Sequence, residues 1–337
     1  MNLPRRRSFG AILFFCCAVH SLSGVTDRRT TGYVTAMLGA PQVGLGTGWL
    51  RGDDAYSTTL RALRIGYRMI DTAADYENED KIGAALRDSK IPRSEIFLIS
   101  KCCVRACSLS AEQAERQLRE SLRALGVTYL DLYLIHVPGE IGRGDEIITN
   151  AIRSGSNFSQ LCRVKSVDYE NTNTLRRAQV WNALNMLKQA GLVRHIGVSN
   201  FGWSHLQELC TSKHGCPSVN QIEWHPLWHD EQLKSEMDKW GIVTMAYAPT
   251  GRNTASAENA ELASLARELN TSVADLSLRW SIGRGVVVIP RASTETHLRS
   301  NLMSSNRPLT ASQMEIIDAV PSSRQNCKYC ADFPNMD

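Results

Sequence analysis

The sequence predicts an α/β fold, a closed (β/α)8 TIM barrel built on eight parallel strands. Short apolar runs alternate with segments of helical spacing along most of the chain, and this alternation is typical of a parallel sheet. Eight strand–helix pairs can be counted, and 337 residues are enough for one barrel of that size. An open, doubly wound sheet is the alternative. Residues 44–48 disfavour it, because they lack the third glycine that opens the helix of a dinucleotide-binding fingerprint.

The strands are expected at short apolar runs, several of which end in a polar or charged residue. The helices are expected where apolar residues recur at helical spacing, and Ser110 is the predicted N-cap of one of them. The predicted strands lie at residues 42–47, 69–71, 96–101, 130–136, 194–199, 218–223, 242–247 and 286–289. The predicted helices lie at residues 53–65, 78–86, 110–125, 175–190, 203–211, 231–240, within 259–282, and at 294–303.

One stretch, residues 138–173, interrupts this alternation of predicted strands and helices. It is long, polar and poorly periodic, and a loop of this length inside a compact domain is usually functional or disordered. We interpret it as a loop that covers the substrate, and a solvated insertion without a role is the alternative. The barrel is assigned to residues 42–310, and residues 311–337 form a C-terminal tail that begins with a short helix.

The N-terminal 24 residues have the layout of a secretory signal peptide. Three arginines at 5–7 precede an apolar run at 9–19, and small residues follow. Residues 25–41 are read as a leader. The prediction is entry into the secretory pathway or an organelle. An uncleaved anchor or a mis-assigned start codon, with a cytoplasmic protein, is the alternative. No later apolar run is long enough to span a membrane.

Charge and cysteine content exclude some classes of function. The net charge of +4 is modest and the basic residues are dispersed, so no nucleic-acid partner is predicted, and the protein is expected to be a monomer. Cys210 and Cys216 flank a short loop and are candidates for a disulfide. No metal site is predicted, because Cys327 and Cys330 lack a further pair of ligands nearby.

Four residues with reactive side chains end or follow three consecutive strands: Asp71, Tyr76, Lys101 and His136. The carboxyl ends of barrel strands form one rim, so these side chains are expected to meet there. Taken singly, they also have structural explanations, as a helix cap, a half-buried aromatic, a solvated strand end and a core histidine respectively.

Together, the four side chains would form a proton-donating unit. A tyrosine is a poor acid at neutral pH because its pKa is about 10, and an adjacent ammonium lowers that value. Lys101 would therefore activate Tyr76, and Asp71 would hold Lys101 through a charged hydrogen bond. His136 would orient a substrate carbonyl or assist the proton transfer.

The stretch that carries Asp71 and Tyr76 resembles the first signature of the aldo-keto reductases. It reads Gly66-Tyr67-Arg68-x-Ile70-Asp71-Thr72-Ala73, and then Tyr76-x-Asn78-Glu79. Three later motifs resemble further signature motifs of that family, in the same order: Ile196-Gly197-Val198-Ser199-Asn200-Phe201, Gln221-x-Glu223-x-His225-Pro226 and Ile289-Pro290-Arg291. The resemblance spans about residues 42–305 and implies that the four reactive residues are a catalytic tetrad.

The resemblance also implies a nicotinamide coenzyme, NADPH or alternatively NADH, because no side chain can supply a hydride. His297 stands where many members have an arginine that clamps the adenosine phosphate, which puts a strong preference for NADPH in doubt. The implied coenzyme contacts are Thr47, Asp71, Ser199, Asn200, Gln221, Tyr247, Arg291, His297 and Asn301. The implied substrate contacts are Trp49, Cys102 and His136.

These observations predict an NADP(H)-dependent oxidoreductase that reduces aldehyde or ketone carbonyls of small molecules to alcohols, with Tyr76 as general acid. Two alternatives stay open. One is a coenzyme-binding, redox-sensing or regulatory barrel with little turnover, like the potassium-channel β-subunits of this family. The other is an unrelated barrel hydrolase that uses Asp71 and Glu79.

Overall fold

The computed structural model describes residues 37–103, 110–139, 167–251 and 259–323, with backbone alone for 167–173. Eight parallel strands form one sheet in the order of the chain. The strands are β1 (Leu45–Gly46), β2 (Met69–Asp71), β3 (Phe97–Cys102), β4 (Leu130–Ile135), β5 (Val193–Ser199), β6 (Val219–Glu223), β7 (Val243–Tyr247) and β8 (Val287–Val288).

The sheet closes on itself between its first and last strands. Val43, just before β1, forms a parallel bridge with Val288 of β8. The backbone N–H groups of Gly44 and Gly46 donate to the carbonyls of Val288 and Pro290, at 2.9 and 3.1 Å. The predicted eight-stranded barrel is therefore confirmed.

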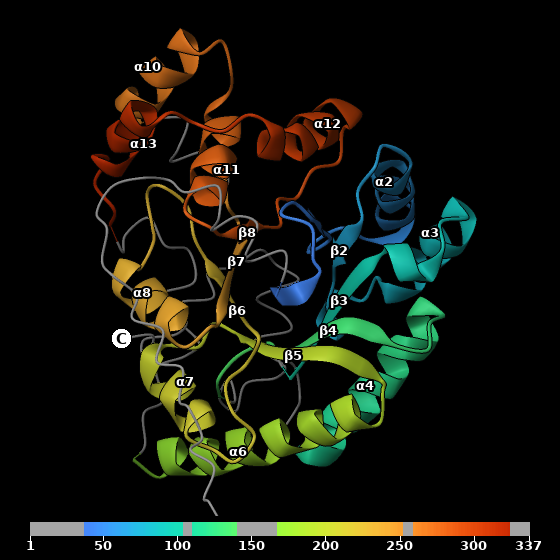
Figure 1. Ribbon diagram of the computed structural model, residues 1–337. Coiled ribbons are helices and arrows are strands. Elements are labelled where there is room, and N and C mark those ends of the chain that lie inside the picture. Colours follow the sequence, from blue (N-terminus) through green and yellow to red (C-terminus); the bar gives the residue numbers. More distant parts are fainter. Residues whose placement is uncertain (1–36, 104–109, 140–166, 252–258, 324–337) are drawn as a thin grey trace, which may run out of the picture.

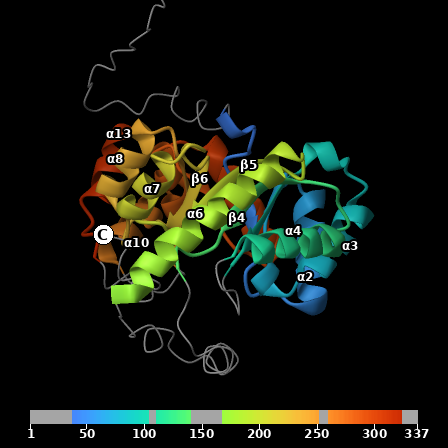
Figure 2. The ribbon, with the colours of Figure 1, turned by 90° about the horizontal axis from the view of Figure 1, so that it is seen from below.

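Helices surround the strands (Figure 1), with α2, α3 and α4 on one side and α7, α8 and α13 on the other, as the view from below also shows (Figure 2). The helices are α2 (Gly52–Arg64), α3 (Glu79–Ser89), α4 (Ala111–Leu125), α6 (Val167–Gln189), α7 (Trp203–Cys210), α8 (Glu231–Lys239), α10 (Ala260–Glu268), α11 (Val273–Gly283), α12 (Glu295–Met303) and α13 (Ala311–Asp318). Short 3₁₀ turns are η1 (Ala74–Tyr76), η2 (Arg93–Glu95) and η4 (Ser304–Asn306). None of the helices in these ranges combines the length and the apolar character that crossing a membrane requires.

Side chains alternate between the two faces of each strand, and this divides the core in two. One buried cluster fills the interior of the barrel and includes Met69, Ile99, Leu134 and Met245. A larger cluster lies between the strands and the helices. The interior is tight at Gly197, where an added Cβ would lie 2.7 Å from the carbonyl oxygen of Val219.

The helix α6 begins earlier than the sequence pattern indicates. It starts at Val167, whereas the prediction placed its start at residue 175. The first turns are mostly polar, with Val167 and Tyr169 as the exceptions, so they lack the apolar spacing by which a helix is recognised in a sequence. The predicted loop at 138–173 is therefore helical from 167 onward, and residues 140–166 lie outside the described ranges. The predicted signal peptide at 1–24 and most of the leader also lie outside them.

Three further predictions can be compared with the structure directly. Cys210 and Cys216 form a disulfide at the end of α7, which confirms the pairing that their spacing allowed. The side chain of Ser110 accepts a hydrogen bond from the backbone N–H of Gln113, which confirms the predicted cap of α4. The short helix predicted after Pro308 is α13, which packs against α10 and α11.

Candidate active site

Three of the four predicted catalytic side chains reach the mouth of the barrel because of strand periodicity. Interior positions recur every second residue, so Asp71 follows Met69 and Lys101 follows Ile99 on the inner face. His136 continues the same series one residue beyond β4, after Leu134. Each of these residues stands at the carboxyl end of its strand, where barrel enzymes place their active sites.

Asp71 and Lys101 form a buried ion pair at the centre of this mouth. The Lys101 Nζ donates to Asp71 Oδ1 at 2.6 Å and to the Thr72 carbonyl oxygen at 2.9 Å. The second oxygen of Asp71 accepts from Gln221 Nε2 at 2.8 Å. Burial lowers the pKa of Lys101, and the Asp71 carboxylate opposes that shift. A buried ion pair persists only when its remaining hydrogen-bonding groups are satisfied, and these contacts satisfy them.

The hydroxyl of Tyr76 lies beside this pair. Tyr76 ends the turn η1, in the loop between β2 and α3, and its hydroxyl oxygen is 3.4 Å from Lys101 Nζ. Its ring meets the His136 ring edge to face, with centroids 5.7 Å apart. The structure thus brings all four predicted catalytic residues together at one end of the barrel.

The surroundings of His136 favour its neutral form. Burial, and then the positive charge of Lys101, lower the pKa of His136 well below its ordinary value of 6.5. Its Nδ1 atom is buried and has no hydrogen-bond partner among the described residues. Its backbone is held by Asn200, whose side-chain Nδ2 donates to the His136 carbonyl oxygen at 3.0 Å. A neutral imidazole carries one N–H group, which can donate to a carbonyl oxygen.

A second group of predicted residues forms a hydrogen-bonded chain on the ends of β5, β6 and β7. The Ser199 hydroxyl donates to the Gln221 carbonyl oxygen at 2.8 Å, and the Asn200 side chain donates to Ser199 Oγ at 3.2 Å. The Tyr247 hydroxyl donates to Asn200 Oδ1 at 2.8 Å. Asn200 has a φ of +63°, a conformation that asparagine tolerates better than most residues. Gln221 joins this chain to the tetrad through its bond to Asp71.

The remaining predicted coenzyme contacts lie outside this hydrogen-bonded chain. The Thr47 hydroxyl donates to the Asp71 carbonyl oxygen at 2.8 Å. Arg291 is exposed just after β8 and makes no ion pair or hydrogen bond with another described residue. His297 lies exposed in the first turn of α12, and Asn301 is buried one turn later. Arg291 thus follows β8, and the other two residues lie on the next helix of the chain.

The two predicted substrate contacts besides His136 differ from each other. Trp49 is 55% exposed in the loop after β1, where its side chain is free to meet a ligand. Cys102 is buried at 1% exposure and belongs to the cluster between strands and helices. It follows Lys101 directly, so it points to the opposite face of β3 from the tetrad. The structure therefore does not bring Cys102 to the other predicted site residues.

Three further residues support the site. The sequence singled out neither Asn78 nor Arg177, and it suggested Glu79 only for the hydrolase alternative. Asn78 is fully buried and hydrogen-bonds both loops that flank Tyr76. Glu79 accepts a hydrogen bond from Ser100 Oγ at 2.6 Å, and burial raises its pKa while that bond opposes the shift. The motif Tyr76-x-Asn78-Glu79 includes Asn78 and Glu79 but does not indicate these roles.

The third is Arg177 of α6, whose guanidinium is 2% exposed. Arg177 donates to the carbonyl oxygen of Pro138, two residues after His136, at 2.9 Å, and pairs with Glu208 of α7. A lone arginine on a helix carries no signal of such a contact in the sequence.

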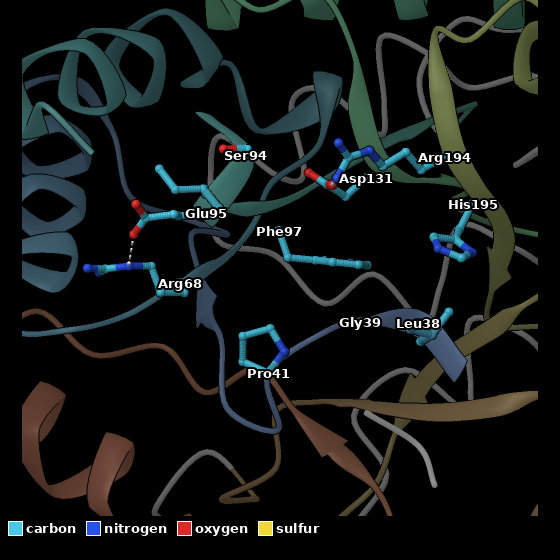
Figure 3. Close-up of a pocket in the computed structure, with 11 residues that line it drawn as sticks. Leu38, Gly39, Pro41, Arg68, Ser94, Glu95, Phe97, Asp131, Arg194 and His195 are labelled. Atoms are coloured by element: carbon cyan, nitrogen blue, oxygen red, sulfur yellow. Dashed lines mark hydrogen bonds and ion pairs between the residues drawn. The ribbon is translucent and has the colours of Figure 1, made fainter. Parts of the chain in front are cut away.

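A cavity of about 220 Å³ lies at the opposite end of the barrel (Figure 3). Phe97 begins β3 and His195 lies near the start of β5, so the cavity faces the amino ends of the strands. Its charged side chains are already paired, Arg194 with Asp131 at 2.9 Å and Arg68 with Glu95 at 3.7 Å. The cavity lies at the amino ends of the strands, so it is separate from the tetrad at their carboxyl ends. No cluster of potential metal ligands occurs among the residues that the structure describes.

Comparison with known proteins agrees with this geometry. A model of the Aldo/keto reductase family matches residues 37–321. An aldo-keto reductase of Mycolicibacterium vanbaalenii is 36% identical over 280 residues, covering 83% of this chain and 88% of that protein. The glycerol 2-dehydrogenase (NADP(+)) of Saccharomyces cerevisiae is 34% identical over 268 residues, covering 77% and 81% respectively.

Solved structures give the same result. The aldo-keto reductase MGS-M4, from a Medee basin deep-sea metagenome library, superposes with a TM-score of 0.70 at 31% identity, covering 84% of this chain and 92% of that one. The fold, the four sequence motifs and these similarities agree, and the chain belongs to the aldo/keto reductase family.

Proposed function

We propose that this protein reduces the carbonyl group of small aldehydes or ketones to an alcohol, with NADPH as hydride donor and Tyr76 as general acid. Membership of the family implies an oxidoreductase that acts on carbonyl compounds. The observation that carries the finer proposal is the convergence of the Tyr76 hydroxyl, the Lys101 ammonium and the neutral His136 ring at one point of the mouth. We further propose that the protein acts as a monomer.

The residues at the mouth fit a nicotinamide coenzyme. A carboxamide needs both donors and acceptors, and Ser199, Asn200 and Gln221 supply both kinds of group at adjacent strand ends. Tyr247 adds a half-buried aromatic ring at the end of β7. Arg291, exposed and without an ion-pair partner among the described residues, is available to a phosphate. When bound, the nicotinamide would supply the hydride that no side chain can provide.

The chain's own residues account for the rest of the reaction. His136 would donate a hydrogen bond to the substrate carbonyl oxygen and so polarise the carbon that accepts the hydride. As negative charge develops on that oxygen, the Tyr76 hydroxyl would transfer its proton to it. The Lys101 ammonium stabilises the phenolate that remains, and Asp71 holds the ammonium in place. Burial of the ion pair keeps these charges from being screened by water.

A titration followed by an activity assay tests the proposal. Quenching of protein fluorescence on addition of NADPH is expected to reveal coenzyme binding. A panel of aldehydes and ketones should then cause loss of NADPH absorbance. Binding without turnover for every compound in the panel would contradict the proposal, and would favour the redox-sensing or regulatory alternative.

The preference between NADPH and NADH would depend on two side chains. Arg291 would contact the 2′-phosphate that distinguishes NADPH from NADH, with His297 in the second position. One charged hydrogen bond contributes about 1.5–3 kcal/mol, so Arg291→Gln should weaken NADPH binding by roughly 10- to 100-fold and leave NADH binding nearly unchanged. His297→Gln should have a smaller effect, because an imidazole lacks the forked geometry with which a guanidinium binds a phosphate.

Dissociation constants for NADPH and NADH, measured at one pH for wild type, Arg291→Gln and His297→Gln, check this prediction. An unchanged ratio of the two constants in Arg291→Gln would remove Arg291 from the coenzyme site. An unchanged ratio in His297→Gln would remove His297 from it. Arg299 would then be the less suitable replacement, because it is paired with Glu295 at 2.7 Å.

We also propose that the N-terminal segment directs the chain into the secretory pathway or an organelle. The proposal rests on the layout of residues 1–24: basic, then apolar, then small. Mass spectrometry of the protein from its native cells should find a mature N-terminus near residues 23–25. A cytosolic chain that begins at Met1 would contradict it.

A further inference from the structure

Asn78 is the residue that precedes helix α3 and lies two positions after Tyr76. Asparagine is preferred at this N-cap position because its side-chain oxygen usually accepts a hydrogen bond from the first turn of the helix. The side chain of Asn78 makes no such bond. It is fully buried and engages neighbouring loops instead. Residues that break a local rule in this way tend to occur at functional sites.

The carboxamide of Asn78 uses both of its N–H groups and its oxygen. Its Nδ2 donates to the carbonyl oxygens of Thr47 and Leu50, at 3.0 and 2.9 Å. Its Oδ1 accepts from the Thr72 hydroxyl at 2.8 Å. The two backbone carbonyls can only accept, so this orientation of the amide is the one that satisfies every group. Asn78 therefore joins the loop after β1 to the end of β2.

Both segments that Asn78 holds are in turn hydrogen-bonded to residues of the tetrad. The backbone carbonyl of Thr72 accepts from Lys101 Nζ at 2.9 Å, and the Thr47 hydroxyl donates to the Asp71 carbonyl oxygen at 2.8 Å. The loop after β1 also forms a wall behind the phenol, because a Cβ on Gly48 would lie 3.5 Å from the Tyr76 ring. The contact between Tyr76 and Lys101, at 3.4 Å, is long for a hydrogen bond and depends on how this loop is held.

We propose that Asn78 is a positioning residue that sets the place of the Tyr76 phenol relative to Lys101 and His136, by tying the Tyr76 loop to the loop after β1 and to the end of β2. This inference rests on the proposed role of Tyr76 as proton donor. Asn78 itself does not touch the reacting atoms. Its three hydrogen bonds act on them through the backbone of the loop.

Asn78→Ser separates this role from helix stability. Serine caps a helix as well as asparagine does, so α3 keeps a favourable N-cap, while the bonds to Thr47 and Leu50 are lost. A misplacement of about 1 Å in a catalytic group can cost about 10²-fold in rate, so kcat should fall by roughly 10- to 100-fold. The dissociation constant for NADPH should change by less than about threefold, because the residues on β5 to β7 are untouched and the Thr47 hydroxyl keeps its bond to the Asp71 carbonyl oxygen.

A titration of the phenol gives a readout that does not require turnover. Tyr76 contacts Lys101 and His136, with Asp71 bound to Lys101 and Glu77 next in its own loop. An ammonium favours the phenolate, so moving Tyr76 away from Lys101 should shift phenolate formation to higher pH. The chain has nine tyrosines, and subtraction of the Tyr76→Phe spectrum isolates this one. In Asn78→Ser, the titration of Tyr76 and the alkaline limb of kcat should both move upward.

Asp275→Asn is the matched control. Asp275 is a buried side chain of α11 that accepts hydrogen bonds from Ser304, Arg307 and Thr271, outside the barrel mouth. The Asp275→Asn variant should lower the midpoint of urea unfolding. It should leave kcat per folded molecule, and the pH profile of kcat, unchanged. Asn78→Ser with wild-type kcat and an unshifted Tyr76 titration would overturn the proposal. A shifted titration in a protein that reduces no carbonyl would instead uphold the positioning role and refute the proposed function.

Discussion

Tyr76→Phe is expected to lower kcat/KM for carbonyl reduction by about 10²- to 10⁴-fold, the usual contribution of a positioned general acid. The substitution removes the hydroxyl that lies 3.4 Å from Lys101 Nζ and keeps the ring that meets His136. Coenzyme binding should stay nearly intact, because Tyr76 is not among the predicted coenzyme contacts. Steady-state kinetics and a fluorescence titration with NADPH measure the two effects separately.

Tyr133→Phe is the control for the loss of a tyrosine hydroxyl. Tyr133 is fully buried on the outer face of β4, and its hydroxyl approaches the Ala114 carbonyl oxygen at 3.4 Å. It lies on the face of β4 that points away from the tetrad, so its variant tests the loss of a buried tyrosine hydroxyl without touching the four residues. Tyr133→Phe should retain wild-type turnover. If Tyr76→Phe also retains most of its turnover, then Tyr76 is not the acid.

Lys101→Met is expected to have the second-largest effect, and it should act on both activity and stability. The ammonium is removed from the phenol, and the buried Asp71 carboxylate keeps only its bond from Gln221. Breaking a buried ion pair on one side typically costs about 3–5 kcal/mol of unfolding free energy. Loss of the activated acid should lower kcat/KM by about 10²- to 10⁴-fold.

The double variant Asp71→Asn/Lys101→Met distinguishes these two effects. Replacing both partners of a buried pair is often neutral for stability, because no uncompensated charge is left. Urea unfolding should therefore recover much of the lost stability in the double variant, while turnover stays low. Recovery of turnover together with stability would mean that Lys101 is a structural residue only.

Much of the site follows from a simple periodicity that the sequence contains. Apolar runs that end at Asp71, Lys101 and His136 mark three strands, and the alternation of side chains turns all three residues to the same interior. The same alternation places Cys102 on the outer face, which is why its position next to Lys101 in sequence was a poor guide to its contacts.

Other features could not be read from the sequence, because they depend on contacts between distant segments. The bonds of Asn78 to Thr47 and Leu50 cross from one loop to another, and Arg177 reaches the carbonyl of Pro138 from α6. The early start of α6 at Val167 was missed for a different reason. The sequence of its first turns is mostly polar, so no apolar periodicity marks them as helical.

Transfer of deuterium from the coenzyme to the product tests the central claim most directly. NADPH that carries deuterium in place of both hydrogens on the reactive carbon of its nicotinamide ring would be mixed with the wild-type protein and an aldehyde that the panel identifies. We expect one deuterium on the carbinol carbon for each NADPH oxidised, with this transfer strongly reduced in Tyr76→Phe and unchanged in Tyr133→Phe. A protein that binds NADPH and yields no deuterated alcohol would contradict it.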